Sequence, residues 1–151
     1  MTARGSGWVV AQFVLMAAVI AAGFVPPDWP GEARAVRIGV GVGLIAAGAG
    51  FAVWACHSLG RALTPFPRPN RAGLATGGPF ALVRHPIYLG LLGVFGGYSL
   101  LAGISALALT AGLALLWVGK TRVEERMLAA VYDEYAAYRT QVRWRLLPFI
   151  Y

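Results

Sequence analysis

The sequence has few charged residues, and acidic residues are especially scarce. Only 13% of its 151 residues are charged, with six acidic and 13 basic side chains, whereas 58% are hydrophobic and the mean hydropathy is +0.65. A soluble protein has about twice this share of charge, and a soluble domain this small could not bury so much apolar surface. The composition therefore excludes an ordinary soluble domain and favours a membrane protein.

Cysteine and histidine, which often form disulfides, bind metals or act in catalysis, are also scarce. The single cysteine, Cys56, excludes an internal disulfide and leaves the redox compartment open. With two histidines, the chain has no metal-ligand spacing, so we predict no metal site. His57 and Ser58 are adjacent and have no nearby acid, which argues against a serine hydrolase. No charge lies within an apolar run, which argues against an ion pathway.

Three long uncharged runs predict the membrane-spanning part. The first, Trp8 to Val25, contains Gln12 as its only strongly polar side chain and ends at Pro26-Pro27. A cleaved signal peptide is the alternative for this run. The second run is Ile38 to Cys56. Gly39 and Gly43 would share one face of that helix, where they favour close packing within the monomer or, alternatively, a dimer contact.

The third run, Ile87 to Gly119, is too long for one span and too short for two full spans. We expect a tight hairpin of two short helices that turns near residues 102–105, each about 24 Å long. The predicted fold is an all-α integral membrane protein of one domain, 1–151. It has four transmembrane helices, about 8–25, 38–56, 87–101 and 104–119, and an amphipathic C-terminal helix.

Two polar segments flank the hairpin. The segment 57–86 contains four prolines between positions 65 and 79, which make a regular helix improbable, and loops of this length are usually functional or disordered. The tail, 120–151, carries apolar residues at spacings of 4, 4, 4, 3 and 4, which predict one amphipathic helix ending before Pro148. Those residues are Val123, Met127, Val131, Tyr135, Tyr138 and Val142.

The basic residues predict the orientation. With four spans, eleven of the 13 basic residues lie on the side that holds both termini and the segment 57–86, and only Arg34 and Arg37 lie on the other. The positive-inside rule makes the first side cytoplasmic. An abundance of Ala, Gly, Val and Arg is typical of a high-GC bacterium, so we expect the bacterial inner membrane. The basic surface would face anionic lipid, and we expect no nucleic-acid partner.

A short polar stretch, Arg84-His85-Pro86, precedes the hairpin. Proline suits the first turn of a helix, so His85 would lie near the N-cap and the helix would begin close to Ile87. Helix N-termini favour anions, so a carboxylate or phosphate could bind there with Arg84. The alternative is that Arg84 is a membrane-surface anchor and His85 a simple cap.

The tail places a second pair of charges on its apolar face. Lys120 and Glu124 fall within the apolar stripe, whereas Glu125 and Arg126 fall outside it and are expected on a solvated face. One interpretation is a simple i,i+4 ion pair, although lysine before glutamate is the weaker order. The alternative is that both side chains face a polar ligand between the tail and the hairpin.

Together these stretches resemble a known family. LATGGPFALVRHPIYLG (residues 74–90), EERML (124–128) and YAAYRTQVRWRLLP (135–148) look like the isoprenylcysteine carboxyl methyltransferases and the related phospholipid N-methyltransferases. The resemblance covers about the C-terminal 90 residues. It implies an S-adenosylmethionine-dependent enzyme without a Rossmann fold, whose cofactor lies between the hairpin and the C-terminal segment while a lipophilic acceptor arrives from the bilayer.

The resemblance also implies individual roles. The predicted catalytic residues are Arg84, from the anion-site argument above, and Lys120 and Glu124, from the resemblance. Lys120 stands where the prenylcysteine enzymes use an arginine at the acceptor site. The predicted cofactor-binding residues are Leu74, Ala75, Phe80, His85, Pro86, Ile87, Tyr88 and Glu124. Phe80 replaces a common tyrosine.

The acceptor and the oligomeric state stay open. An isoprenoid-type carboxylate or thiol and an aminophospholipid are both compatible with the sequence. Two other classes also remain: a non-catalytic membrane protein that binds anionic lipid or a partner, and a membrane reductase of the steroid-reductase type that uses NADPH. The chain ends in Phe149-Ile150-Tyr151, which is not a prenylation signal.

Overall fold

The computed structural model of the chain describes residues 3–25, 29, 31, 33–67, 69 and 72–150, and these form helices without any strand. The α-helices are α1 (Ala3–Ala22), α2 (Arg34–Leu59), α3 (Pro86–Ala102), α4 (Ile104–Ala129) and α5 (Tyr135–Gln141), and the short 3₁₀-helices are η1 (Gly60–Ala62) and η2 (Gly78–Ala81). Pro26, Pro27, Arg68 and Arg71, which entered the sequence predictions, lie outside the described residues.

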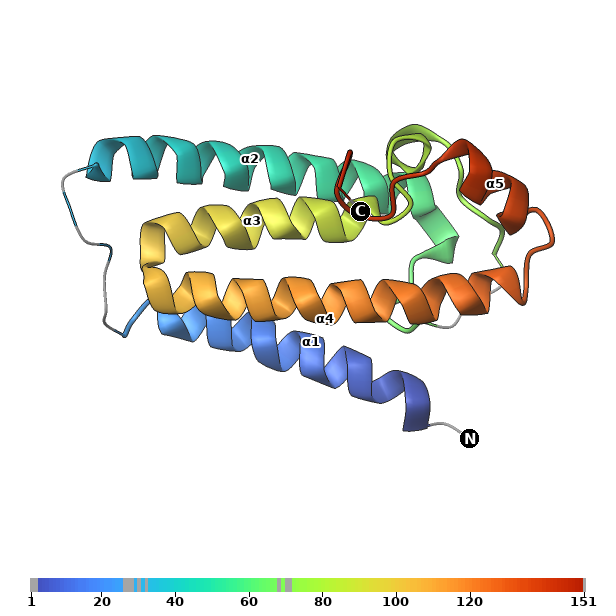
Figure 1. The fold of residues 1–151 in the computed structure, drawn as a ribbon, viewed down its shortest axis with the longest axis horizontal. Coiled ribbons are helices and arrows are strands. Elements are labelled where there is room, and N and C mark those ends of the chain that lie inside the picture. The colour runs from blue at the N-terminus through green and yellow to red at the C-terminus, as the bar shows by residue number, and fades with distance from the viewer. Residues whose placement is uncertain are drawn as a thin grey trace.

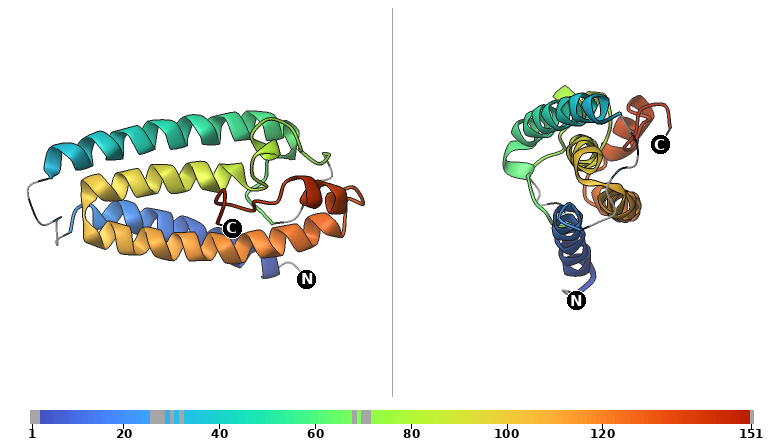
Figure 2. Two further views of the ribbon diagram at one scale, coloured as in Figure 1. Left: turned by 45° about the horizontal axis from the view of Figure 1, so that its top comes forward. Right: turned by 90° about the vertical axis from the view of Figure 1, so that its left-hand side faces the viewer.

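Four long helices lie side by side and alternate in direction (Figure 1). The end-on view shows α3 between α2 and α4, with α1 on the outer side of α4 (Figure 2). The packing agrees with this order, because α2 contacts α3 most extensively and α1 contacts α4. The start of α1, the end of α2, the start of α3, the end of α4 and the short α5 all lie at one end of the bundle (Figure 1). The segment 57–86 and the tail therefore meet, as the sequence predicted.

Glycines bring α2 and α3 into backbone contact. A Cβ added at Gly48 would meet the carbonyl oxygen of Gly90 at 2.5 Å, and one added at Gly41 would meet that of Gly97 at 2.8 Å. Gly41 and Gly48 are seven residues apart on α2, as are Gly90 and Gly97 on α3, so each pair lies on one face of its helix. The prediction that Gly39 and Gly43 provide the packing face within the monomer was wrong. Both point to open space.

The α3–α4 hairpin turns where the sequence predicted, but its second arm is longer. Gly103 lies between the two helices with φ 143°, a conformation that favours glycine. α4 then continues without a break from Ile104 to Ala129 and carries the polar residues from Lys120 onward. Within the described residues, three helices are long and apolar enough to cross a membrane: Gly5–Ala22, Arg34–Ala62 and Ile104–Ala129. The helix Pro86–Ala102 is apolar but shorter.

The tail is not the single amphipathic helix that its apolar spacing predicted. α4 ends at Ala129, and α5 covers only Tyr135–Gln141 before the backbone becomes extended at Val142. The break contains Val131, Tyr132 and Asp133, which are weak helix formers. After α5 the chain runs back to the start of α3, where the backbone N–H groups of Arg84 and His85 each donate a 2.9 Å hydrogen bond to the carbonyls of Trp144 and Arg145.

Candidate functional site

A cavity of about 390 Å³ lies at the end of the bundle where the segment 57–86 and the tail meet. Its walls come from α1, the segment after α2, the start of α3, the end of α4 and α5. Every residue predicted to bind a ligand or act in catalysis lines this cavity: Leu74, Ala75, Phe80, Arg84, His85, Pro86, Ile87, Tyr88, Lys120 and Glu124. The structure thus brings together residues that lie up to 50 positions apart.

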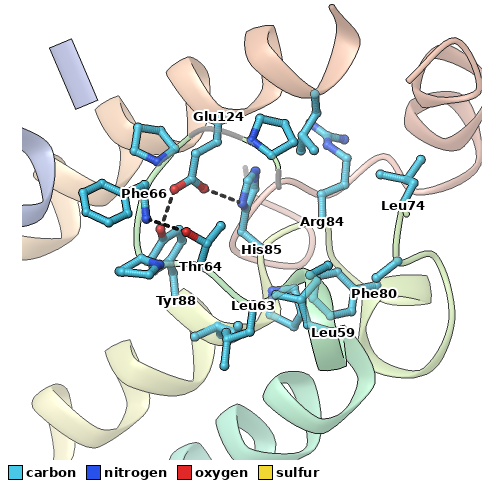
Figure 3. Close-up of a pocket in the computed structure, with 18 of the residues that line it drawn as sticks. Leu59, Leu63, Thr64, Phe66, Leu74, Phe80, Arg84, His85, Tyr88 and Glu124 are labelled. Carbon is cyan, nitrogen blue, oxygen red and sulfur yellow. Dashed lines mark hydrogen bonds and ion pairs between the residues drawn. The ribbon is translucent and has the colours of Figure 1, made fainter. Parts of the chain in front are cut away.

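The start of α3 aims two of these side chains at α4. Pro86 is the first residue of the helix, where its missing N–H costs nothing, and His85 is the N-cap residue. The imidazole does not cap the helix. Instead its Nδ1 lies 3.4 Å from Oε2 of Glu124, and one turn further on the Tyr88 hydroxyl donates a 2.7 Å hydrogen bond to Oε1 of the same carboxylate (Figure 3).

His85 lies between two carboxylates. Its Nε2 is 3.4 Å from Oε1 of Glu125, an ion-pair distance too long for a good hydrogen bond, and this atom has no hydrogen-bond partner among the described residues. Burial alone lowers the pKa of His85, but the adjacent carboxylates of Glu124 and Glu125 outweigh burial and raise the pKa above its usual 6.5. The site therefore favours the imidazolium.

Lys120 is the only lysine of the chain, and it is fully buried. Its Nζ donates hydrogen bonds of 2.8 Å to Oε1 of Gln12 and 2.9 Å to the carbonyl of Pro65. The nearest oxygen of Glu124 is 3.8 Å away, and the ammonium lies 5.3 Å from the centre of the Tyr88 ring. Lys120 and Glu124 therefore share the cavity, but they are not a tight i,i+4 ion pair.

Glu125 was expected on a solvated face, and this prediction was wrong. Its side chain is 4% exposed and accepts hydrogen bonds from Nε of Arg84 (2.8 Å) and from Nε and Nη2 of Arg145 (3.0 and 2.9 Å). The tail turns back over α4 here, so the tail buries Glu125 although it lies outside the apolar stripe. The apolar spacing could not predict this burial, because it was interpreted as one continuous helix.

Arg84 is held by the protein itself. Besides Glu125, its guanidinium donates 2.7 Å hydrogen bonds to the carbonyls of Val142 and Arg143. The anion beside Arg84 in this structure is therefore a carboxylate of the chain. A contact between Arg84 and a ligand stays a prediction.

Gln12, Tyr135 and Tyr138 also line the cavity but were not among the predicted site residues. Gln12 comes from α1, and its signal was its isolation as the one strongly polar side chain in an apolar run. Tyr135 and Tyr138 come from α5 and are buried. The Tyr138 hydroxyl donates a 2.7 Å hydrogen bond to the Phe80 carbonyl, and burial raises its pKa to about 12. The Tyr135 hydroxyl has no hydrogen-bond partner among the described residues, and burial also raises the pKa of Tyr135.

Comparison with known proteins identifies the family. The sequence profile of the phospholipid methyltransferases matches residues 36–135, about two thirds of the chain. The chain belongs to this family. All ten predicted site residues lie inside the matched segment, whereas Gln12 and Arg145 lie outside it. The family indicates a membrane methyltransferase, in agreement with the apolar helices.

One curated relative is a bacterial protein with a different description. The cobalt-zinc-cadmium resistance protein CzcN of Cupriavidus metallidurans is 43% identical over 70 residues, which cover 43% of this chain. The match spans about a third of the length of CzcN, 31%. Among the described residues of our chain, no group of three or more His, Cys, Asp or Glu side chains could hold a metal ion.

Proposed function

We propose that the protein is an integral membrane methyltransferase that moves a methyl group from S-adenosylmethionine to a lipophilic acceptor. The observation that carries the proposal is the convergence of His85, Tyr88, Lys120 and Glu124 in one cavity of an otherwise apolar helix bundle. Such a cavity with few polar groups is typical of small-molecule sites. The methyltransferase family supplies the reaction type.

The residues fit S-adenosylmethionine in size and chemistry. The cavity volume of about 390 Å³ lies within the range of roughly 300–1,000 Å³ found for small-molecule sites. Glu124 supplies a negative charge for the amino group or ribose diol, and the rings of Phe80 and Tyr88 offer surface to the adenine or the sulfonium. Leu74, Ala75, Pro86 and Ile87 add apolar wall, and His85 holds Glu124 in place.

When bound, S-adenosylmethionine supplies an electrophilic methyl group. The work left to the protein is alignment and exclusion of water. Tyr88 and His85 fix both oxygens of Glu124. Lys120 places a positive charge on the wall beside them, where it would meet the reacting group of the acceptor, and Arg84 holds the tail closed over the site. A carboxylate or thiolate acceptor needs no general base here, whereas an amine must first lose a proton.

We also propose the membrane arrangement. Three helices have the length and apolar character of spans, and α3 is the shorter fourth, which would cross a locally thinned bilayer or lie inside the bundle. The cavity and both chain ends would face the cytoplasm, because eleven of the 13 basic residues belong to the N-terminal stretch before the first apolar run, the segment 57–86 and the tail. An acceptor with a lipid tail would then reach the cavity from the inner leaflet.

The decisive experiment combines binding and transfer. Purified protein in detergent is titrated with S-adenosylhomocysteine by calorimetry and then given methyl-labelled S-adenosylmethionine with a total lipid extract. We expect saturable binding and label in an extractable lipid. Glu124→Gln should weaken binding at least about tenfold, since it removes a half-buried charge that would pair with the ligand. The matched variant Glu134→Gln, on the exposed surface, should bind like the wild type.

Three results would argue against the proposal. Folded wild-type protein that does not bind S-adenosylhomocysteine would overturn it. Equal binding by wild type and Glu124→Gln would remove the site assignment. Saturable binding of NADPH in place of S-adenosylhomocysteine would replace the methyltransferase with a reductase.

A further inference from the structure

Gln12 is a buried polar residue in the middle of an apolar helix, and it faces the cavity. It is 7% exposed, lies on α1 and lines the cavity together with Glu124 of α4. Its Oε1 accepts hydrogen bonds from Nζ of Lys120 at 2.8 Å and from Nε1 of Trp117 at 3.2 Å. Both partners are donors only, so chemistry fixes which end of the amide faces them. Gln12 thus presents one acceptor oxygen to the only ammonium side chain of the protein.

The distances from the ammonium of Lys120 to the surrounding oxygens indicate what Gln12 prevents. Two neutral oxygens, those of Gln12 and of the Pro65 backbone, lie within 2.9 Å of Nζ, while the charged oxygen of Glu124 is 3.8 Å away. An ammonium in an apolar site would otherwise move to the nearest carboxylate, because opposite charges attract strongly where water is excluded. Gln12 offers a competing partner, and the contact between Lys120 and Glu124 stays loose.

The carboxylate of Glu124 already has partners from α3. Tyr88 donates to Oε1 of Glu124, and His85 lies beside Oε2. A tight contact with Lys120 would add a full positive charge to Oε1 and leave little negative potential for the ligand. Gln12 also holds Trp117, whose ring stacks on Tyr88 with centroids 5.4 Å apart. Each hydrogen bond of Gln12 therefore holds a side chain near Glu124: Lys120 directly, and Trp117 through its stacking on Tyr88.

We propose that Gln12 is a positioning residue of the methyltransferase site: it holds the ammonium of Lys120 away from Glu124 and so keeps that carboxylate available to the methyl donor. The proposal rests on the proposed function for the identity of that ligand. It assigns a task to α1, which lies outside the segment that matches the family. The helix then completes the site as well as anchoring the protein in the membrane.

A purely structural role makes a different prediction. Polar side chains often join helices within membranes, and their loss weakens helix association. Ser99 and Thr110 form such a pair, with buried hydroxyl oxygens 2.9 Å apart, and neither residue lines the cavity. If Gln12 only joined α1 to α4, its loss would lower the stability of the fold and would leave the affinity of the folded protein for the ligand unchanged.

The test is a double-mutant cycle with S-adenosylhomocysteine as the ligand. Gln12→Met keeps the length of the side chain and removes the acceptor oxygen. We expect it to weaken binding about tenfold in the wild-type background, because Lys120 loses the charge-assisted hydrogen bond that holds it away from Glu124 and can then pair with that carboxylate. In the Lys120→Met background the same change should alter binding less than about twofold. The control Thr110→Val removes another buried interhelical hydrogen bond and should lower stability without changing affinity.

A second measurement does not depend on ligand binding. Because Lys120 is the only lysine, ¹⁵N-lysine labelling gives one side-chain ammonium signal in NMR spectra. We expect Gln12→Met to shift this signal and to change the hydrogen exchange rate of the ammonium protons. Thr110→Val should leave both unchanged.

The outcomes separate the two proposals. An equal loss of affinity in both backgrounds, or no loss in either, overturns the role of Gln12 while leaving the methyltransferase assignment intact. An unchanged ammonium signal in Gln12→Met overturns it whatever the protein binds. Wild-type protein that does not bind S-adenosylhomocysteine overturns the methyltransferase assignment, and with it the role of Gln12 at that site, even if the signal shifts.

Discussion

Arg84 and Glu125, 41 residues apart in the sequence, form a buried ion pair with 2.8 Å between Nε and Oε1. The same guanidinium holds the carbonyls of Val142 and Arg143, and Glu125 also binds Arg145. One carboxylate on α4 and one arginine before α3 therefore fix the extended segment after α5. This segment closes the end of the bundle beside the cavity. Of the two adjacent acids, Glu124 lines the cavity, whereas Glu125 holds this segment in place.

We expect Glu125→Gln to destabilise the fold strongly. The change leaves Arg84 buried without the counter-charge of Glu125, and breaking a buried pair by removing one partner costs about 3–5 kcal/mol. The free energy of unfolding, measured in detergent micelles by tryptophan fluorescence, should fall by about this amount. Glu134→Gln, on the surface, is the matched control and should change stability by less than about 0.5 kcal/mol. A loss below about 1 kcal/mol for Glu125→Gln would contradict the structural task.

The raised pKa of His85 predicts that the free energy of unfolding depends on pH. The folded state raises the pKa of His85 above 6.5 because Glu124 and Glu125 outweigh burial, so folding favours the protonated form. The contribution of this group is complete below about pH 6.5, the value of the unfolded chain, and is lost as the pH rises through the higher folded pKa. Unfolding should be followed from pH 5.5 upward for wild type and His85→Gln.

The wild-type advantage over His85→Gln should shrink as the pH rises. His57→Gln is the control, since His57 is exposed at the end of α2. An advantage that grows with pH would mean that burial dominates and that His85 is neutral in the folded protein.

Two buried tyrosines on α5 should respond differently to loss of the hydroxyl. Tyr138 donates to the Phe80 carbonyl, so Tyr138→Phe should lower the free energy of unfolding by about 1 kcal/mol. The Tyr135 hydroxyl is buried without a hydrogen-bond partner among the described residues, so Tyr135→Phe should be neutral or stabilising. Chemical denaturation of the two variants in the same detergent compares them directly. Equal losses would show that the Tyr135 hydroxyl makes a stabilising contact.

Local sequence signals predicted the long helices, and they selected residues that the structure brings to one cavity. Apolar runs located all four long helices, because an uncharged stretch of about 18 residues matches the length of a membrane-spanning helix. The bounds agree to within five residues except at the end of α4, which continues ten residues past its uncharged run. The RHP stretch and the pair Lys120 and Glu124 pointed to the same place, and both line one cavity. These signals depend on residues close in sequence, so they can be recognised without knowledge of the tertiary structure.

The errors came from features that depend on tertiary contacts. Apolar spacing suggested one helix through the tail, but Tyr135 and Tyr138 are buried by packing after a break at residues 130–134. The same assumption placed Glu125 in solvent. In α2, glycines recur at both faces, and only the position of α3 decides that Gly41 and Gly48 are the packed pair. Gln12 was visible as an isolated polar residue, but its partner Lys120 is 108 positions away.

The two faces of α2 give a prediction in which neighbouring glycines have opposite effects. A methyl group at Gly48 would lie 2.5 Å from the Gly90 carbonyl oxygen and 2.8 Å from the Val94 nitrogen, whereas one at Gly50 would meet nothing within 4 Å. Gly48→Ala should therefore cost about 1–3 kcal/mol through overpacking. Gly50→Ala should be neutral or stabilise by up to about 1 kcal/mol, because alanine is the better helix former.

The close contact at Gly90 lies five residues from His85, so the same variants also test how the helix packing supports the site. Gly48→Ala must push α3 away from α2, and His85 and Tyr88 move with the start of α3. Binding of S-adenosylhomocysteine should weaken in Gly48→Ala and stay at the wild-type level in Gly50→Ala. Thermal unfolding and calorimetry on the two variants supply both readouts. If Gly48→Ala were as stable as Gly50→Ala, the backbone contact between α2 and α3 would be refuted, and with it the placement of the cavity's α3 wall.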